Sequence, residues 1–306
     1  MNKVKKNKLV LATLSALFAQ VIFGFSFMFT KIALNYSAPM TVIANRYMVA
    51  FLGMTVVLFA TKTKIKISKN IWKMLLMSVF QPLLYFVFES YGIKMTTSSF
   101  SSIMISLIPV VAMISGIFFL NEKPLFMQYV FTALSVLGVV ITALVGKSDG
   151  TVTALGIILL FGAVLSSTGY NILSRKISGE FTAFERTYVM TLVGLVFFSA
   201  IAFAENVDNP IEIITPFLSV PYAISVLYLG IVSSVVAFIF LNYANTHLPV
   251  ARTTVFSNIT TVVSVIAGAV FLDEKISSVS ILAVVMIIIG VFGVQIAGVR
   301  KNNSSV

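Results

Sequence analysis

The sequence predicts an all-α integral membrane protein whose ten transmembrane helices form two inverted five-helix repeats. The first observation is the composition: 58% of the 306 residues are hydrophobic and 10% are charged, which leaves too little polar surface for a water-soluble domain. The second is a series of continuous apolar runs, each close to the ~20 residues that one helix needs to cross a bilayer. The third is an internal repeat at about half the chain length.

Charged or turn residues separate the apolar runs from one another. The first run follows four lysines, but its uncharged length from Leu9 to Thr30 exceeds that of a secretory signal, and similar runs follow it. Continuous runs exclude a β-barrel, whose strands are short and alternate in polarity. The predicted spans are Leu9–Leu34, Pro39–Ala60, Trp72–Ile93, Ser98–Leu120, Leu125–Gly146, Val152–Ser174, Phe184–Ala204, Phe217–Tyr243, Val250–Leu272 and Ser277–Val299.

The distribution of basic residues predicts that both termini lie in the cytoplasm. With the N-terminus inside, sixteen of the 21 Lys and Arg residues fall on the cytoplasmic side, where short loops of membrane proteins concentrate them. The acidic link Glu205–Glu212 then falls outside. The net charge of +11 is therefore explained by membrane topology, and we expect no nucleic-acid partner.

The internal repeat relates the fourth span to the ninth. A shift of 152 residues aligns Val110–Lys123 with Val262–Lys275, and eight of the fourteen positions are identical. The copies are five crossings apart, and because an odd number of crossings reverses direction, the two halves are inverted. We assign residues 1–149 to the first repeat and 150–306 to the second. Such halves can open a central site to one side and then to the other, which favours a transporter, although inverted repeats also occur in channels.

The sequence offers little for catalysis. It has no Cys and a single histidine, His247, so a Cys nucleophile and a His-rich metal site are both excluded. A phosphate-binding GxGxxG or Walker loop is also missing, which excludes ATP-driven transport by this chain alone. We therefore expect no enzyme activity, no metal and no cofactor; the expected partners are the lipid bilayer and a small-molecule substrate.

The third span carries a polar stripe. Pro82 removes a backbone donor in mid-membrane and predicts a bend there. Glu89 lies in the outer half of the hydrocarbon region, where an ionisable side chain must face protein or water. We expect an outward-opening cavity in which Glu89 binds a substrate ammonium or a proton. The alternative is a structural ion pair with Arg46, and Lys31 is a second possible charge partner. The stripe consists of Ser78, Gln81, Tyr85, Glu89 and Gly92.

Small hydroxyl and amide side chains in other spans complete the candidate site. Such side chains can line a polar cavity, but they also join transmembrane helices to each other, which is the alternative for each of them. The candidate substrate-binding residues are Gln20, Gln81, Tyr85, Glu89, Ser102, Ser106, Tyr170, Asn171 and Asn258.

Two acidic motifs follow the repeated spans. They are Asn121–Pro124, with the sequence NEKP, and Asp273–Lys275, with the sequence DEK. Asn121 or Asp273 can cap the helix that follows, and the Glu of each motif then lies beside the positive end of that helix. We predict that both motifs are hinge or capping features, and that neither binds substrate.

Four segments carry a resemblance to a known family and together cover nearly the whole chain. They are FGFSFMFTKIALNYSAP…ANRY, YGIKMTTSSFSSIMISLIPV, NYANTHLPVARTTVFSNITTV, and the helix ends FLNEKP and FLDEKIS. These segments resemble the ten-helix EamA group of the drug/metabolite transporter superfamily. The chain departs from the family pattern at Phe23, where a Trp is frequent, and at Thr261, where a Pro is common. The matching positions include Gly24, Lys31, Pro39, Arg46, Tyr91, Ser98, Pro109 and Tyr243.

The resemblance implies a secondary transporter of the bacterial cytoplasmic membrane that exports or exchanges small metabolites, often amino acids or other amphipathic compounds. Some relatives move nucleotide sugars, sugar phosphates or drugs, so a carrier for such compounds, or a flippase for lipid-linked sugars, is the alternative. Proton coupling, exchange and facilitated diffusion all stay open. The duplication supplies both halves within one chain, so a monomer is compatible with the sequence and the oligomeric state stays open.

Overall fold

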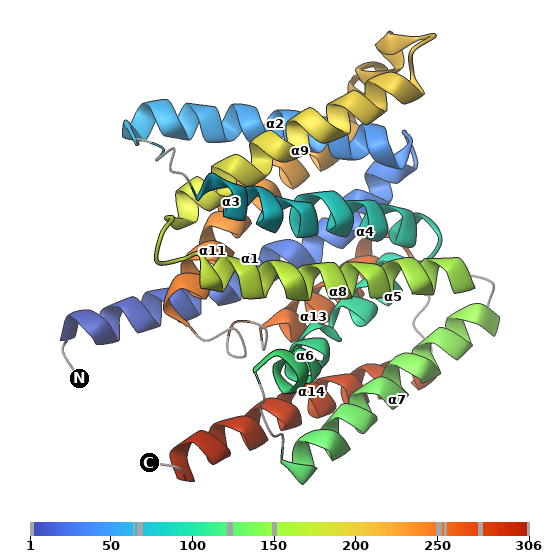
Figure 1. Cartoon of the computed structure of the whole chain (residues 1–306). Helices are drawn as coiled ribbons and strands as arrows, with labels where there is room; N and C mark the ends of the chain where they lie inside the picture. Colours follow the sequence, from blue (N-terminus) through green and yellow to red (C-terminus); the bar gives the residue numbers. More distant parts are fainter. Residues whose placement is uncertain are drawn as a thin grey trace.

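The computed structural model shows a bundle of helices (Figure 1). The described residues form helices and connecting turns, without a strand among them. Both chain ends lie at the same end of the bundle (Figure 1), which we call the terminal end; the opposite end is called the distal end. The structure describes residues 3–63, 65, 70–120, 125–148, 152–248, 253, 256–274 and 278–304.

Within the described part of the chain, six helical segments are long and apolar enough to cross a membrane, and four shorter apolar helices accompany them. Each of the ten overlaps one predicted span. The long segments are Asn7–Leu34, Pro39–Thr61, Ile71–Lys94, Ala154–Lys176, Ala183–Glu205 and Val220–His247, and the shorter ones are Ser98–Ala112, Phe126–Thr142, Ser257–Phe271 and Ile281–Gly290. The chain therefore folds as a multi-pass membrane protein.

Local sequence explains several helix ends. Pro39 occupies the first turn of its helix, where its missing N–H is not needed. Thr182 and Glu185 form a capping box at the start of another helix. The elements are α1 (Lys3–Leu34), α2 (Pro39–Thr61), α3 (Ile71–Ser78), η1 (Val79–Leu84), α4 (Tyr85–Lys94), α5 (Ser98–Ile105), α6 (Ile108–Leu120), α7 (Phe126–Ser148), α8 (Ala154–Lys176), α9 (Ala183–Glu205), η2 (Pro210–Ile213), η3 (Thr215–Leu218), α10 (Val220–Leu227), η4 (Tyr228–Ala237), α11 (Phe238–His247), α13 (Ser257–Phe271) and α14 (Ser278–Ser304).

Three of the predicted spans are irregular near their middle. The bend expected at Pro82 is confirmed: η1 is a π-helical turn, and Gln81 has extended backbone angles (φ −147°, ψ 114°). The eighth span also contains a π-helical segment, η4. π-Helical turns in α-helices are frequent at functional sites.

The fourth span is not the continuous helix that we predicted. It divides into α5, which ends at Ile105, and α6, which begins at Ile108. Pro109 explains the break, because it has no N–H to donate to the carbonyl of Ile105. At the break, the hydroxyl of Ser106 donates to the carbonyl of Ile103 at 2.6 Å.

Helices α7 and α14 pack against each other along one side of the bundle (Figure 1). Their close approach requires glycine at two positions. A Cβ atom at Gly138 would lie 2.7 Å from the carbonyl oxygen of Ala283, and one at Gly290 would lie 2.6 Å from that of Phe131. The remaining helices pack around a buried core and enclose the candidate site.

Candidate functional site

A cavity of about 610 Å³, counting the space at its mouth, lies between the helices of both sequence halves. Its wall combines polar and apolar side chains. The lining residues are Gln20, Phe23, Ser26, Phe27, Arg46, Gln81, Tyr85, Phe86, Glu89, Ile105, Ile108, Ser167, Asn171, Ser233, Phe238, Leu241, Thr253, Ser257 and Thr260.

Glu89 is the acidic group of the cavity. The side chain is 4% exposed, and its Oε1 accepts a hydrogen bond from the Tyr85 hydroxyl at 3.0 Å, one helical turn earlier on α4. The other carboxyl oxygen, Oε2, has no hydrogen-bond partner among the residues that the structure describes, and neither does Oε1 of Gln81. A buried acceptor without a partner is unfavourable. These two oxygens therefore favour a ligand that donates hydrogen bonds.

Arg46 is the basic group of the cavity and is 3% exposed. Its Nε donates to the hydroxyl of Ser234 at 2.7 Å, and its Nη2 donates to that of Ser233 at 3.0 Å. The guanidinium carbon lies 4.1 Å from the centre of the Phe86 ring, a cation–π distance. Arg46 lines the cavity, so an anionic ligand group in the cavity can approach its guanidinium.

Arg46 and Glu89 line one cavity without forming the ion pair that we considered as an alternative. Among the described residues, the pair within 4.0 Å joins Lys73 to Glu180 instead. Since neither cavity charge neutralises the other directly, both remain available to a ligand.

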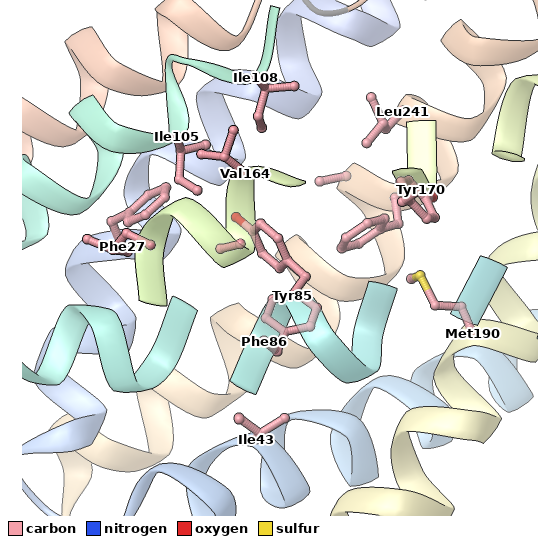
Figure 2. Close-up of a cluster of buried hydrophobic side chains, with 14 of the residues drawn as sticks. Phe27, Ile43, Tyr85, Phe86, Ile105, Ile108, Val164, Tyr170, Met190 and Leu241 are labelled. Carbon is pink, nitrogen blue, oxygen red and sulfur yellow. The ribbon is translucent and has the colours of Figure 1, made fainter. Parts of the chain in front are cut away.

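Apolar side chains form another part of the cavity wall. Figure 2 shows Tyr85 in the middle of a set that includes Phe27, Phe86 and Leu241. Phe86 and Phe238 lie edge to face, with ring centres 6.3 Å apart. A ligand with an apolar group can therefore contact aromatic and aliphatic surface on the sides that the charged groups leave free.

Two further predicted residues line the cavity and also join helices. The hydroxyl of Thr260 donates to Gln20: it lies 2.7 Å from the side-chain Oε1 of Gln20 and 2.9 Å from the backbone oxygen of Gln20. Asn171 donates to the carbonyl of Ser167 at 2.9 Å and accepts from the amide of Asn245 at 3.1 Å. Both side chains thus connect the cavity to neighbouring helices.

The other predicted residues lie away from the cavity lining. Ser102 and Ser106 are buried and donate to carbonyls of their own segment. Tyr170 donates to Oδ1 of Asn242 at 2.9 Å. Asn258 is 2% exposed, and neither polar atom of its side chain has a hydrogen-bond partner in the described part of the chain. Lys31 lies near the distal end, where its ammonium donates to backbone carbonyls.

Sequence reasoning missed the serines that hold Arg46. Ser233 and Ser234 are adjacent in the long apolar run of the eighth span, and Ser26 of α1 bonds to Ser233 at 2.9 Å. The available signal was a pair of polar residues inside an otherwise apolar run. Nothing in the sequence indicated that their partner lies 187 or 188 positions away.

Comparison with known proteins identifies the family. The model of the EamA-like transporter family matches the chain twice, over residues 10–144 and 154–296. The chain belongs to this family. The resemblance to the EamA group of the drug/metabolite transporter superfamily is therefore confirmed, and the EamA-family protein described here is a membrane transporter.

Its relatives carry the same general description. YcxC, an uncharacterized transporter of Bacillus subtilis (strain 168), is 32% identical over 289 residues, which cover 93% of each chain. YetK, an uncharacterized transporter of the same organism, is 26% identical and covers 94% of this chain and 87% of its own. These names agree with the expectation that the chain is not an enzyme. A crystal structure titled only as that of a protein matches with a TM-score of 0.65 and 14% identity, over 93% of this chain and 98% of its own, and shows the fold alone.

The cavity of this EamA-family protein lies where the two sequence halves meet. The shift of 152 residues that relates the fourth and ninth spans also moves η1 to residues 231–236, inside η4. Five pairs of cavity-lining positions obey the same shift. In three of the five, one member is polar and the other apolar, so the two halves make unequal contributions to the wall. The pairs are Gln81 and Ser233, Phe86 and Phe238, Glu89 and Leu241, Ile105 and Ser257, and Ile108 and Thr260.

Proposed function

We propose that this protein is a secondary transporter that exports or exchanges an amino acid, or a similar amphipathic compound, by alternating access across the bacterial cytoplasmic membrane. The single observation that carries the substrate class is the set of polar groups in one cavity: two acceptors without a partner among the described residues, Glu89 Oε2 and Gln81 Oε1, and one cationic donor, the Arg46 guanidinium. An ammonium satisfies the acceptors, and a carboxylate satisfies the donor.

The proposed architecture is ten crossings in two inverted repeats, residues 1–149 and 150–306, with both termini in the cytoplasm. Two separate matches of the family model support the division. The ten apolar helices and the common position of both chain ends support an even number of crossings. The five cavity pairs related by one shift support a site at the interface of the repeats, where transporters of this design bind their substrates.

The substrate's orientation follows from the unequal walls. The ammonium lies toward Glu89 and Gln81 of the third span, and the carboxylate lies toward Arg46 of α2. The apolar part then contacts Phe86, Phe238 and neighbouring aliphatic side chains. When no substrate is bound, Glu89 can bind a proton in place of the ammonium, and the transporter then exchanges substrate for protons.

The test is counterflow of labelled amino acids in proteoliposomes, with and without a pH gradient. Saturable counterflow is expected, and Glu89→Gln should reduce it about tenfold or more, because a lost hydrogen bond to a charged group costs roughly 1.5–3 kcal/mol. Glu180→Gln is the matched control, since Glu180 is exposed and bonds to Lys73 at the terminal end.

Three results would contradict the proposal in different ways. Unchanged counterflow in Glu89→Gln would remove Glu89 from the site. Counterflow of nucleotide sugars, lipid-linked sugars or drugs, with none of amino acids, would replace the substrate class. Ion currents that do not saturate would indicate a channel instead of a carrier.

A further inference from the structure

Three sequence motifs that the proposed site does not use meet at the distal end. They are the FTK segment of α1 with Lys31, the turn between α4 and α5, and the DEK motif after α13 with Glu274. We predicted that Glu274 lies beside the helix that follows it. The structure corrects this: Glu274 binds the start of α5, a helix of the other sequence half.

The contact of Glu274 with α5 uses both carboxyl oxygens. Oε1 accepts from the backbone N–H of Ser98 at 2.7 Å. Oε2 accepts from the N–H of Ser99 at 2.9 Å and from its hydroxyl at 2.5 Å. The side chain of Thr97 accepts from the N–H of Phe100 at 3.0 Å. The free N–H groups at this helix start are thus occupied, and the carboxylate lies at the positive end of the helix dipole.

Lys31 holds the same turn from the other side. Its ammonium donates to the carbonyl oxygens of Ile93 at 3.0 Å and of Thr96 at 2.5 Å. These carbonyls belong to the end of α4 and the turn that follows, where the helix dipole favours a positive charge. A cation at the end of one helix and an anion at the start of the next therefore fix the α4–α5 turn between them.

The chain positions Glu274 by reversing direction after α13. Asp273 has a positive φ of 53°, a conformation that Asp tolerates better than most residues. The N–H of Glu274 then donates to the carbonyl of Gly268 at 3.1 Å. A Cβ atom at Gly268 would lie 2.5 Å from the hydroxyl oxygen of Ser99. Glycine at this position therefore allows α13 to approach the start of α5 closely enough for the contact.

We infer that Lys31, Glu274 and the turn Lys94–Ser99 form a clamp that keeps the distal end of the transporter closed, and that opening of this end releases Glu274 from α5. The inference rests on the alternating access proposed above. The distal clamp joins the two sequence halves at Glu274, so the halves cannot separate at this end while its bonds to Ser98 and Ser99 persist. Glu274 and Lys31 are both partly exposed, so water can solvate the released charges.

The experiment measures access to the cavity from each side of the membrane. The chain has no Cys, so Ile108→Cys in the cavity wall provides a single reactive thiol. Its rate of modification by a membrane-impermeant thiol reagent is compared in right-side-out and inside-out vesicles. Adding Glu274→Gln should raise the rate about tenfold from one side, because it removes charged hydrogen bonds that hold that end closed. The control is Asp273→Asn, which removes the neighbouring exposed carboxylate.

Lys31→Met is a second, independent variant and should raise the rate from the same side. If neither Glu274→Gln nor Lys31→Met changes the rate from either side, in protein that purifies as a single species, the clamp is disproved. Counterflow by the parent protein decides the proposed function separately. If the variants raise the rate of thiol modification but the vesicles transport no tested amino acid, the result supports the clamp and contradicts the substrate class. If counterflow is saturable but the rate of thiol modification is unchanged in the variants, the result supports the substrate class and contradicts the clamp.

Discussion

The two ends of the bundle are held together by different kinds of contact. At the terminal end, the fully buried guanidinium of Arg186 bonds to neutral oxygen atoms. At the distal end, the side chain of Glu274 accepts hydrogen bonds from backbone N–H groups of α5 and remains partly exposed. The acceptors of Arg186 are the carbonyls of Thr182, Ser174 and Asn242 and the hydroxyls of Ser174 and Thr246.

The difference lies in which parts of the chain are connected. All partners of Arg186 belong to α8, α11 and the turn before α9, so its network lies entirely within residues 150–306. The distal contacts join the two halves: Glu274 to α5, and Thr153 to the carbonyl of Met95 at 3.2 Å. A network within one half moves with it as a unit, whereas contacts between halves must break when the halves separate. We therefore infer that the Arg186 network braces the second half at the terminal end, and that the Glu274 contacts form a gate at the distal end.

The largest expected effect comes from locking the distal end covalently. The hydroxyl oxygens of Ser98 and Ser264 are 3.4 Å apart and belong to α5 and α13. In the double variant Ser98→Cys, Ser264→Cys, oxidation should form a disulfide and abolish counterflow, because the halves can no longer separate at this end. Reduction should restore it, and each single variant controls for the substitutions. Full counterflow by the crosslinked protein would show that the distal end does not open along this contact.

A smaller but still large effect is expected at the terminal end. Arg186→Met leaves the oxygens of Ser174, Asn242 and Thr246 without their donor and should lower the free energy of unfolding by about 3 kcal/mol or more, measured as thermal unfolding of the purified protein in detergent. Arg175→Met is the matched control: Arg175 also donates to two carbonyls, but it is partly exposed and should cost less. Equal losses would contradict the bracing role.

If the terminal network moves as one unit, Arg186→Met should leave distal access unchanged. The thiol at Ile108→Cys should react from the distal side at the parent rate, in contrast to the Glu274→Gln variant. A rate increase equal to that of Glu274→Gln would mean that both networks control the same gate, and the comparison between the two ends would fail.

Much of the fold was predictable because membrane helices leave a strong local signal. Pro39 begins α2 as predicted, and the bend at Pro82 follows from a missing backbone donor. The break between α5 and α6 had the same kind of signal in Pro109. The prediction used only the length of the apolar run there, and a run of sufficient length does not exclude a break.

The site was less predictable because its contacts are distant in sequence. Periodicity placed Gln81, Tyr85 and Glu89 on one stripe, and all three line the cavity. Periodicity could not pair Arg46 with Ser233, because that contact depends on how α2 packs against η4. Glu274 shows the same limit: its motif indicated that it caps a helix, but only the packing of α13 against α5 determines which helix.

The smallest expected effect concerns the ion pair that joins the two halves at the terminal end. Lys73 Nζ lies 2.5 Å from Oε1 of Glu180, and Asn70 donates to Oε2 at 2.9 Å. The hydrogen bond from Lys73 lowers the pKa of the Glu180 carboxyl below its usual value, and the one from Asn70 adds to the shift. Because the folded-state pKa is the lower one, the contact stabilises the protein fully above the unfolded-state pKa of about 4.3, and this stabilisation is lost as the pH falls through the folded-state pKa.

Exposure limits what this pair contributes, because water and salt screen the two charges. Glu180→Gln should therefore lower the unfolding temperature only slightly at pH 7 and low salt, and the difference from the parent should disappear as the pH falls below the folded-state pKa of Glu180 and at high salt. The measurement is thermal unfolding of both proteins across this pH range. A difference that persists in acid and in salt would mean that Glu180 joins the halves by packing instead of charge. The terminal end would then also be closed between the halves, and the contrast between a brace and a gate would no longer hold.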